Sequence, residues 1–476
     1  ALAILMCAAM LIGTTFAWFT DTASTGVNKI VSGNLKVDII GADSDSHIEK
    51  LNFTKAATTD AEAGAEILWE PGCRYLTEGF RIANKGNLAL KWKAQVNTGT
   101  TAANEGNFDL LDVIDFYLVT KAADGTETET ALDEFTGNLK KTETSDVYYI
   151  KGVMQTTAGN DYQGLTLDGI SITVVATQDT VESDSFDNQY DKDAEYPILV
   201  RTGDELQAIV SNATAPVNIV LTNSITTNNF VIPADKDVTL DLNGRTVTNA
   251  GSHTILNKGH LTLTDSSADK SGQIISLKGN TAALRNGDNA VCVVEGGTIS
   301  RDGANGNTWH VVENFGKMTF NGGKVVLKNG NGFAITNGWN YFDPGASTTH
   351  AVMEINALEL DTDSSGIKNC RYGDLTVNDV TVTSTGYWAL SNDYLGTAVI
   401  NGGTLTSNSF KAVSNGAAMT VNGGTFDGTQ GFFVQSYATS TVLNGGTFAN
   451  MNVDALSSYV GTGHTAQQSG TSVIIK

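Results

Sequence analysis

A short pattern that recurs in the second half of the sequence most limits what this chain can fold into. It consists of two apolar residues at positions i and i+2, an Asn-Gly turn and a second β-branched run. Copies stand at 238–244, 375–378, 398–403, 419–424 and 441–446, and in the last part they are 21 to 23 residues apart. Because one copy cannot bury its own apolar residues, neighbouring copies must stack. The pattern therefore predicts the successive coils of a β-helix.

A column of asparagines supports the same register. Each of them follows an apolar strand and stands before or near a glycine. Coils that stack about 4.8 Å apart would let the side-chain amides bond along the column as an asparagine ladder. The predicted ladder consists of Asn257, Asn286, Asn314, Asn337, Asn369, Asn392 and Asn415.

These features resemble the pectate-lyase-like right-handed β-helix superfamily over about residues 198–476. The opening segment 219–247, with its LDLNG core, is similar to bacterial surface members of that superfamily. The resemblance implies the fold and leaves the function open. A capping box from Thr202 to Glu205, ahead of Leu206, predicts a short helix that shields the first coil.

The first part of the chain carries strand-like alternation instead. Its apolar runs predict the strands of a sandwich. The predicted strands are 35–40, 80–83, 88–96, 113–119, 147–150 and 170–176. Pro71-Gly72 predicts a turn of type II character, and segment 80–89 predicts a hairpin made of a strand, a tight Asn/Gly turn and a second strand.

The chain begins with an uncharged apolar run, residues 1–17, which ends in small residues and is followed by polar Thr20 to Thr22. This run predicts a signal peptide cleaved between Ala17 and Trp18. It is short for a membrane-spanning helix. A buried core helix is the alternative interpretation.

Several of these features fall in the order found in the TasA/camelysin family. They are the leader, which resembles SipW-type signal peptides, then Gly33 to Val37, Pro71-Gly72, segment 80–89 and Ala176-Thr177-Gln178. The resemblance covers about residues 1–180. It implies a jelly-roll sandwich that polymerises when the N-terminal segment of one subunit pairs into a sheet of the next. The implied donor residues are Trp18, Phe19, Val27 and Ile30. An ordinary first strand within the same chain is the alternative.

The predicted fold class is all-β, a jelly-roll sandwich domain followed by a right-handed parallel β-helix. Acids crowd segment 179–197, which predicts a solvated linker between the two. The predicted organisation is a signal peptide at 1–17, a sandwich at 18–178, the linker at 179–197 and the β-helix at 198–476.

The charge of the chain limits its partners. The net charge of −22 argues against nucleic acid as a partner, and against stable membrane insertion once the signal is removed.

Four cysteines in 476 residues do not make a disulfide framework. Cys292 and Cys370 would lie about three coils, roughly 14 Å, apart, too far for a disulfide. With Cys7 in the leader, Cys73 makes the remaining number odd, so at least one thiol is expected to be free.

Aromatic residues follow the asparagine column in several coils. Trp339, Tyr372 and Tyr394 are expected to stack along one side with Arg371 beside them, and flat rings with polar neighbours suit the faces of sugars. The glycan-binding candidates are Trp339, Tyr341, Arg371, Tyr372, Trp388 and Tyr394. The alternative is that these rings only cover the edges of the coils.

The sequence favours a secreted cell-surface or biofilm-matrix protein that self-associates through its first domain and displays the β-helix as an adhesin or glycan-binding module. A secreted polysaccharide lyase or glycoside hydrolase is the alternative. Arg371 among Asp361, Asp363, Asp374 and Asp393 is a conceivable lyase site. No catalytic residue is assigned.

A camelysin-like metallopeptidase is the second alternative. His47 is the only histidine of the first domain, and the chain has no HExxH motif, so the sequence predicts no metal site there. No cofactor is expected either.

Overall fold

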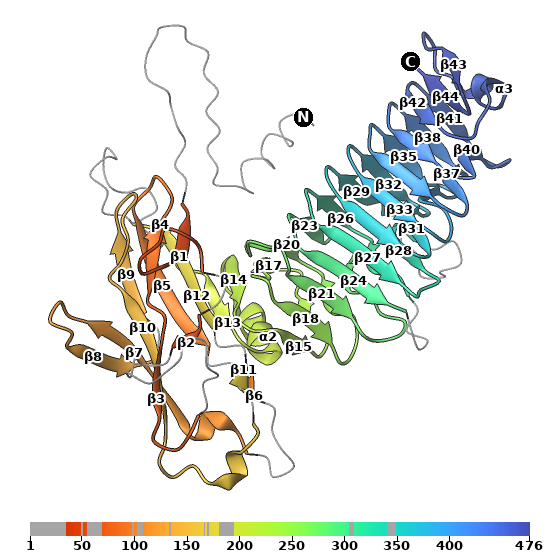
Figure 1. Ribbon diagram of the computed structural model, residues 1–476. Helices are drawn as coiled ribbons and strands as arrows, with labels where there is room; N and C mark the ends of the chain where they lie inside the picture. Colours follow the sequence, from red (N-terminus) through yellow and green to blue (C-terminus); the bar gives the residue numbers. More distant parts are fainter. Residues whose placement is uncertain are drawn as a thin grey trace, which may run out of the picture.

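The computed structural model describes residues 35–48, 51–54, 69–97, 100–101, 108–132, 135–165, 167–168, 171–179, 195–303, 309–339 and 349–476. They form an antiparallel sandwich followed by a right-handed parallel β-helix, as predicted (Figure 1). Some predictions lie outside the described residues. These are the signal peptide with its cleavage site at Ala17 and Trp18, the donor residues Trp18, Phe19, Val27 and Ile30, most of the linker, and Tyr341.

Two antiparallel sheets make up the sandwich. The first contains β1 (Val37–Gly41), β2 (Phe53–Thr54), β3 (Arg74–Thr77), β4 (Phe80–Asn84), β7 (Ile114–Lys121), β8 (Glu127–Ala131) and β10 (Tyr148–Met154). The second contains β5 (Leu90–Asn97), β9 (Phe135–Leu139) and β12 (Ser171–Gln178) in the order β12-β5-β9. A separate pair is formed by β6 (Thr100–Thr101) and β11 (Leu167–Asp168), and the short helices are η1 (Leu110–Asp112) and η2 (Asn160–Tyr162).

Both sheets contribute to one core. Phe80 and Ile150 of the first sheet and Trp92 of the second are almost fully buried and belong to the same cluster. Gly137 of β9 makes room for the indole, because a Cβ at this position would lie 2.6 Å from Cζ2 of Trp92. The sandwich is therefore closed by side chains that meet across the two sheets.

The predicted hairpin at 80–89 is wrong. β4 pairs with β1 and β10, whereas β5 pairs with β12 and β9 in the other sheet. Buried Asn84 explains the difference, since its Nδ2 donates to the carbonyl oxygens of Leu88 (2.7 Å) and Lys140 (3.1 Å) and stabilises a corner between the sheets. The turn at Pro71-Gly72 is present: Cys73 N donates to Glu70 O (2.9 Å), and Gly72 has φ 88°.

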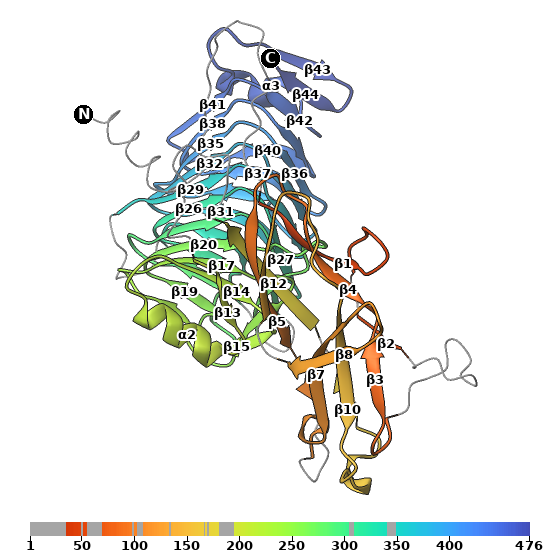
Figure 2. The same cartoon turned by 90° about the vertical axis from the view of Figure 1, so that its left-hand side faces the viewer.

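Three parallel sheets form the β-helix (Figure 2). Sheet I contains β13 (Ile198–Val200), β14 (Val217–Leu221), β17 (Asp237–Asp241), β20 (His260–Thr264), β23 (Val291–Val294), β26 (Lys317–Phe320), β29 (Ala351–Ile355), β32 (Gly373–Val377), β35 (Thr397–Ile400), β38 (Ala418–Val421) and β41 (Ser440–Leu443). Sheet II contains β15 (Ile225–Thr227), β18 (Thr246–Asn249), β21 (Gln273–Ser276), β24 (Thr298–Asp302), β27 (Lys324–Lys328), β30 (Glu359–Thr362), β33 (Thr381–Ser384), β36 (Thr404–Ser407), β39 (Thr425–Asp427) and β42 (Gly446–Phe448). Sheet III contains β16 (Val231–Ile232), β19 (Ile255–Asn257), β22 (Leu284–Asn286), β25 (Val312–Asn314), β28 (Phe333–Asn337), β31 (Ser365–Asn369), β34 (Leu390–Asn392), β37 (Lys411–Asn415) and β40 (Gln430–Val434).

The interior of the β-helix is built from aligned columns. In sheet I the register places Leu240, Leu263, Val294, Phe320 and Ile355 in one column, and all five are buried. Strands that alternate apolar and polar residues send every second side chain inward, so each coil adds one layer to the core. This is the packing that the recurring apolar pair predicts.

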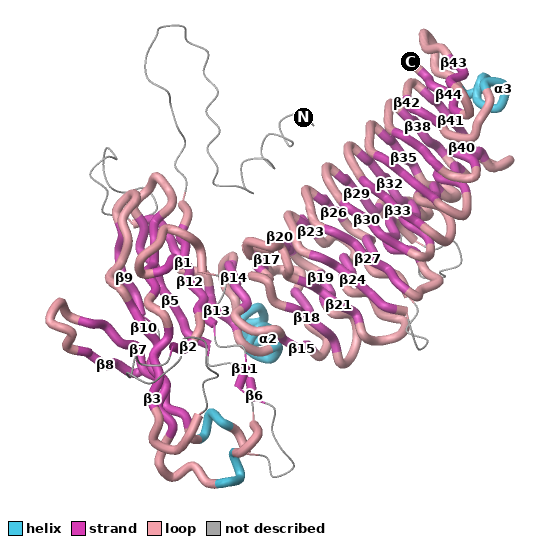
Figure 3. The backbone as a smooth tube through the Cα atoms, viewed as in Figure 1, coloured by secondary structure: helices cyan, strands magenta, loops and turns pink. Residues whose placement is uncertain are grey.

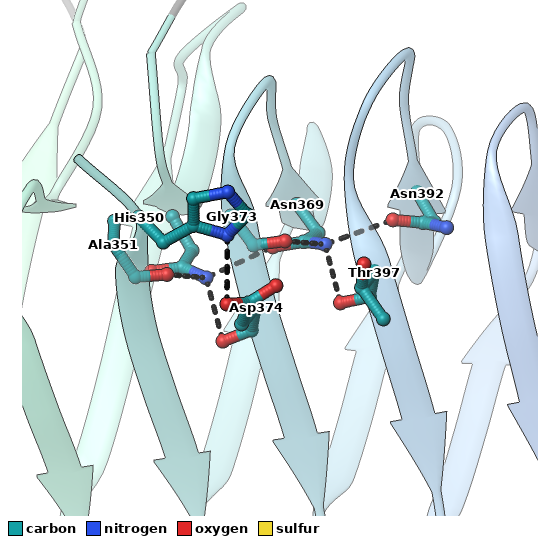
Figure 4. A network of polar contacts seen from close by, with 8 residues as sticks. His350, Ala351, Asn369, Gly373, Asp374, Asn392 and Thr397 are labelled. Carbon is teal, nitrogen blue, oxygen red and sulfur yellow. Dashed lines mark hydrogen bonds and ion pairs between the residues drawn. The ribbon is translucent and has the colours of Figure 1, made fainter. Parts of the chain in front are cut away.

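The seven predicted ladder asparagines form one buried chain of side-chain hydrogen bonds. Each Nδ2 donates to the Oδ1 of the next asparagine along the chain, from Asn257 to Asn415, over 2.7 to 2.9 Å. Figure 4 shows the part around Asn369 and Asn392. Each amide also donates to backbone carbonyls of its own or a neighbouring coil, as Asn369 does to Thr397 O (3.0 Å). The column therefore ties the turn after sheet III from coil to coil.

A second asparagine ladder runs along the outside, at the turn between sheets I and II. Its members are Asn321, Asn356, Asn378, Asn401, Asn422 and Asn444, joined over 2.7 to 2.9 Å. Its first amide, Asn321, donates to Glu295 Oε1 (2.9 Å). Because a carboxylate only accepts, this contact fixes the direction, and each Nδ2 points toward the N-terminal coils. The two ladders thus run in opposite directions. Four of the five asparagines of the recurring pattern belong to the exposed one, whereas Asn243 of the first copy donates to Leu221 O (3.0 Å).

Both ends of the β-helix are covered. Helix α2 (Gly203–Asn212) begins as predicted: Glu205 N donates to Thr202 Oγ1 (3.2 Å), and Glu205 Oε2 accepts from Arg201 N (2.8 Å). Gln207 of this helix accepts from Val231 N (2.8 Å) and donates to Val231 O (3.0 Å), which satisfies the outer edge of β16.

At the other end, β44 (Ser472–Ile475) joins sheet II antiparallel and pairs with β43 (Ala466–Ser469). Helix α3 (Val453–Leu456) and η4 (Ser457–Tyr459) precede this hairpin (Figure 3). In the part of the chain that the structure describes, no helix is long and apolar enough to cross a membrane.

Candidate functional site

The outer face of sheet III and the turns beside it carry polar and aromatic side chains in several successive coils. Each ladder asparagine points inward, so the residue directly before it points outward. The outward column is Leu256, Arg285, Glu313, Thr336, Lys368, Ser391 and Ser414. Glu313 is only 3% exposed and Ser414 only 2%. Side chains of the flanking turns must therefore cover this column.

Glu313 is the centre of the N-terminal part of this face. Its Oε2 lies 3.0 Å from Arg285 Nη1, and its Oε1 accepts from Trp309 Nε1 (3.0 Å). Burial raises the pKa of Glu313, and this effect outweighs the opposing effects of Arg285 and Trp309. The guanidinium of Arg285 also lies over the Phe315 ring, 4.6 Å from its centroid. A buried acid is thus held between a cation and an indole.

Lys368 forms the middle of the face. Its Nζ lies 3.0 Å from Asp393 Oδ2 and 5.0 Å from the centre of the Phe333 ring. Two coils separate Lys368 from Glu313, which corresponds to about 10 Å along the axis. The face therefore presents separate charged groups along a line instead of one compact cluster.

Exposed rings surround the C-terminal part of the face. Tyr387 (54% exposed) precedes β34, Tyr394 (47%) follows it, and Tyr437 (55%) follows β40. With Leu395 these are four of the nine exposed large hydrophobic side chains in the described residues. Lys411 Nζ lies 3.3 Å from the centre of the Phe433 ring.

The structure brings most of the predicted glycan-binding residues to the edges of this face. Trp339, Arg371, Tyr372 and Tyr394 lie in the turns after sheet III, whereas Trp388 lies in a turn before it, on the opposite edge. Trp339 N donates to Arg371 O (2.9 Å), and Arg371 Nη2 donates to Tyr372 Oη (3.1 Å).

The rings of the predicted stack have other neighbours. Trp339 packs on Phe315, with centroids 4.5 Å apart, and Tyr372 faces His350, with centroids 5.6 Å apart. Among the described contacts, Trp339 and Tyr372 do not stack on each other. Trp388 instead packs edge-on against Phe410 (5.1 Å).

The conceivable lyase site does not assemble around Arg371. Asp361 pairs with Lys328 on sheet II (2.8 Å), Asp374 with His350 on sheet I (2.9 Å), and Asp393 with Lys368 (3.0 Å). Asp363 accepts from Asn329 N (2.6 Å). The acids are close in sequence, but the coil distributes them over different faces.

Sequence reasoning missed Arg285, Glu313, Lys411, Tyr387 and Tyr437. A usable signal existed for Arg285 and Glu313, because the residue directly before each ladder asparagine must face outward. No comparable signal marks the tyrosines, which stand in turns of irregular length.

Apart from this face, the reactive groups of the described residues include a histidine–aspartate pair and three thiols. His47 Nδ1 lies 2.6 Å from Asp38 Oδ1 in the sandwich. No group of three His, Cys, Asp or Glu side chains in the described ranges could hold a metal ion. Cys73, Cys292 and Cys370 are free thiols, and burial raises the pKa of Cys292 and Cys370 to about 12.

No protein-family model matches this sequence, and no curated protein matches it. Among solved structures, the chain is similar to the catalytic domain of a GH87 α-1,3-glucanase variant in complex with tetrasaccharides. The TM-score is 0.20 and the identity 10%, over 86% of this chain and 99% of that one. A likeness of this degree says nothing about what the present chain binds.

Proposed function

We propose that this chain is an extracellular surface or matrix protein whose β-helix binds a glycan along the outer face of sheet III. The observation that supports this proposal is the cluster of exposed tyrosines beside a line of polar side chains. Aromatic rings pack against the apolar faces of sugars, while hydroxyl and charged groups bond their hydroxyls.

The geometry favours an extended polymer over a compact ligand. Successive coils repeat the outward position about every 4.8 Å, so the polar groups form a line parallel to the axis of the β-helix. Ser391 and Ser414 of this line are buried, so the polar group of this part that a sugar can reach is Lys411, which stands beside the line at the start of β37. Tyr387 and Tyr394 stand on opposite sides of the same coil. A sugar chain along the axis would meet rings on both sides.

Affinity electrophoresis in gels that contain pectate, xylan, hyaluronan or dextran tests the binding. The triple change Tyr387→Ala, Tyr394→Ala and Tyr437→Ala should weaken the affinity for the polysaccharide at least about tenfold, because tyrosines are enriched among the few interface residues whose truncation costs more than about 1 kcal/mol. Val442→Ala, an exposed apolar residue of sheet I in the C-terminal coils, is the matched control and should leave it unchanged. Equal retardation of all three proteins would refute the site.

Glycan cleavage is a second candidate, favoured by Glu313. An acid whose pKa is raised by burial can donate a proton to a leaving oxygen. Hydrolysis also needs a second carboxylate about 5 to 10 Å away. Within the described residues, Glu313 forms hydrogen bonds with Arg285 and Trp309, and neither partner is a carboxylate. A reducing-end assay with wild type and Glu313→Gln decides: activity that the variant lacks would establish cleavage.

We also propose that the sandwich domain joins the chain to a fibre or matrix by strand addition, as its resemblance to the TasA/camelysin family implies. The outer edge of β1 is already partly covered, because Ile48 N donates to Ile39 O (3.0 Å) and Gly41 N donates to Ser46 O (3.3 Å). What supports the proposal is β12, which ends the second sheet and contributes partly buried apolar residues to the common core. Such an edge offers unpaired backbone groups to an incoming strand.

Electron microscopy of the chain beginning at Trp18, beside a chain beginning after Ile30, tests this. Fibres from the longer chain alone would support a donor segment that includes Trp18, Phe19, Val27 and Ile30. Monomers from both chains would remove self-association and leave the β-helix as the functional part.

A further inference from the structure

Two histidines tie successive coils together where the chain enters sheet III. His253 and His310 stand two residues before Ile255 and Val312, which occupy the same position in the register of the sheet. His253 Nδ1 accepts the backbone N–H of Ala282 (2.8 Å) from the next coil. His310 Nδ1 accepts the N–H of Phe333 (3.1 Å) in the same manner. In each case an imidazole takes the place of a carbonyl oxygen as the acceptor.

An imidazole can play this part only when it is neutral. Neutral histidine has one nitrogen that accepts, whereas the protonated ring has two N–H donors and no acceptor. Protonation would therefore turn Nδ1 from a partner of the backbone N–H into a second donor that faces it. A backbone N–H that is buried without an acceptor costs about 1 to 3 kcal/mol.

The charged groups around the two rings add to this effect. Arg285 and Arg301 act on His253, while Lys368 and Arg301 act on His310. The acid in the neighbourhood is Glu313, which already pairs with Arg285 and Trp309. Burial first, and these cations second, lower the pKa of both histidines to about 4 from the usual 6.5.

His310 is also in contact with the proposed binding face. Its ring centroid lies 5.3 Å from that of Trp309 and 6.1 Å from that of Phe333. Trp309 in turn donates to Glu313. The hydrogen bond of His310 thus fixes the turn that carries the indole over the buried acid.

We propose that His253 and His310 are acid-sensitive clasps. In neutral solution their hydrogen bonds hold the turn before each sheet III strand to the next coil. Protonation breaks these bonds, which loosens Trp309 and Glu313 and weakens glycan binding. The effect on the glycan rests on the proposed function, whereas the opening of the clasps does not.

The sign follows from proton linkage. The open state, with histidines of ordinary pKa, binds protons that the closed state excludes, so the stability of the closed state is complete above pH 6.5 and is lost as the pH falls toward 4. For one histidine with these two pKa values, the population of the open state rises about 20-fold between pH 7 and pH 5.

Hydrogen exchange of the full chain without ligand tests the clasps. Segments that contain Ala282 and Phe333 should lose about 20-fold protection between pH 7 and pH 5, after correction for the intrinsic pH dependence of exchange. The segment around Tyr387 is the internal control, because Tyr387 N donates to the carbonyl of Ser364 (3.0 Å) and not to an imidazole. Unchanged protection at Ala282 and Phe333, or an equal loss at Tyr387, would overturn the proposal.

His253→Asn and His310→Asn keep an acceptor oxygen near the Nδ1 position but cannot be protonated in this range. Protection in these variants should be the same at both pH values. If a variant does not fold, the comparison of segments within the wild type still decides. Binding of xylan or pectate at both pH values is measured separately. If none of the four polysaccharides tested above binds at pH 7, the proposed function fails while the exchange result stands.

Discussion

The two asparagine ladders provide a matched test of what a ladder contributes to stability. Asn369 is fully buried, and its side chain bonds four groups: Asn337 Nδ2 (2.9 Å), Gly373 O (2.9 Å), Asn392 Oδ1 (2.8 Å) and Thr397 O (3.0 Å). Asn369→Ala removes all four bonds at once (Figure 4). Since buried polar groups without partners cost about 1 to 3 kcal/mol each and the neighbours relax in part, we expect a loss of about 3 to 5 kcal/mol.

Asn401→Ala makes the same change in the exposed ladder. Asn401 bonds Asn378 and Asn422, both over 2.8 Å, and Asn401 and Asn422 are exposed while Asn378 is half-buried. Water can replace the lost partner, so the expected loss is below about 1 kcal/mol.

Urea unfolding followed by circular dichroism measures the difference. With a slope near 3 kcal/mol/M, Asn369→Ala should lower the midpoint by about 1 M or more, and Asn401→Ala by less than about 0.3 M. Equal shifts of the two midpoints at unchanged slope would refute the reasoning. They would mean that burial does not determine how much a ladder asparagine contributes to the free energy of unfolding.

Three further predictions follow from the described contacts. Gly137→Ala should destabilise the sandwich by about 1 to 3 kcal/mol and change the fluorescence of Trp92, because the new methyl group would lie 2.6 Å from its ring in the present packing. Gln207→Ala should raise hydrogen exchange in β16 and leave the C-terminal coils unchanged, because it uncovers the first edge of sheet III. Cys292 and Cys370, whose pKa values are raised to about 12, should resist iodoacetamide at pH 8 in the folded protein and react in urea.

The fold of the β-helix could be predicted because its signal is repeated. Each coil needs inward apolar residues at fixed positions, so Leu240, Val377 and Val421 stand in comparable contexts and indicate the register together. The asparagine column could be predicted for the same reason. The exposed ladder was missed because its asparagines were interpreted only as turn residues, although their repetition at the same turn was visible.

Single local signals were less reliable. Segment 80–89 contains a strand, an Asn/Gly turn and a strand, but only the pairing of β4 with β1 and of β5 with β12 decides that these strands belong to different sheets. That choice depends on residues 37–41 and 171–178, which are far away in sequence. Local turn chemistry does not contain this information.

The candidate site could be predicted from the sequence only in part. Its polar column could have been derived, because Glu313 and Lys368 each stand directly before a ladder asparagine. Its rings could not, because turns of irregular length give no register. Tyr387 and Tyr437 are placed beside sheet III only once the lengths of the coils are known.

The covered ends of the β-helix bear on where the chain can assemble. A parallel coil with an open end offers backbone groups to another coil, and end-to-end stacking would follow. Here helix α2 and Gln207 occupy the first edge of sheet III, and the antiparallel strands β44 and β43 end sheet II. Addition of a further strand is therefore disfavoured at these two edges. In the described residues of the sandwich, segment 46–48 bonds part of the outer edge of β1, whereas no helix covers β12, so a strand from outside is expected to bind at β12.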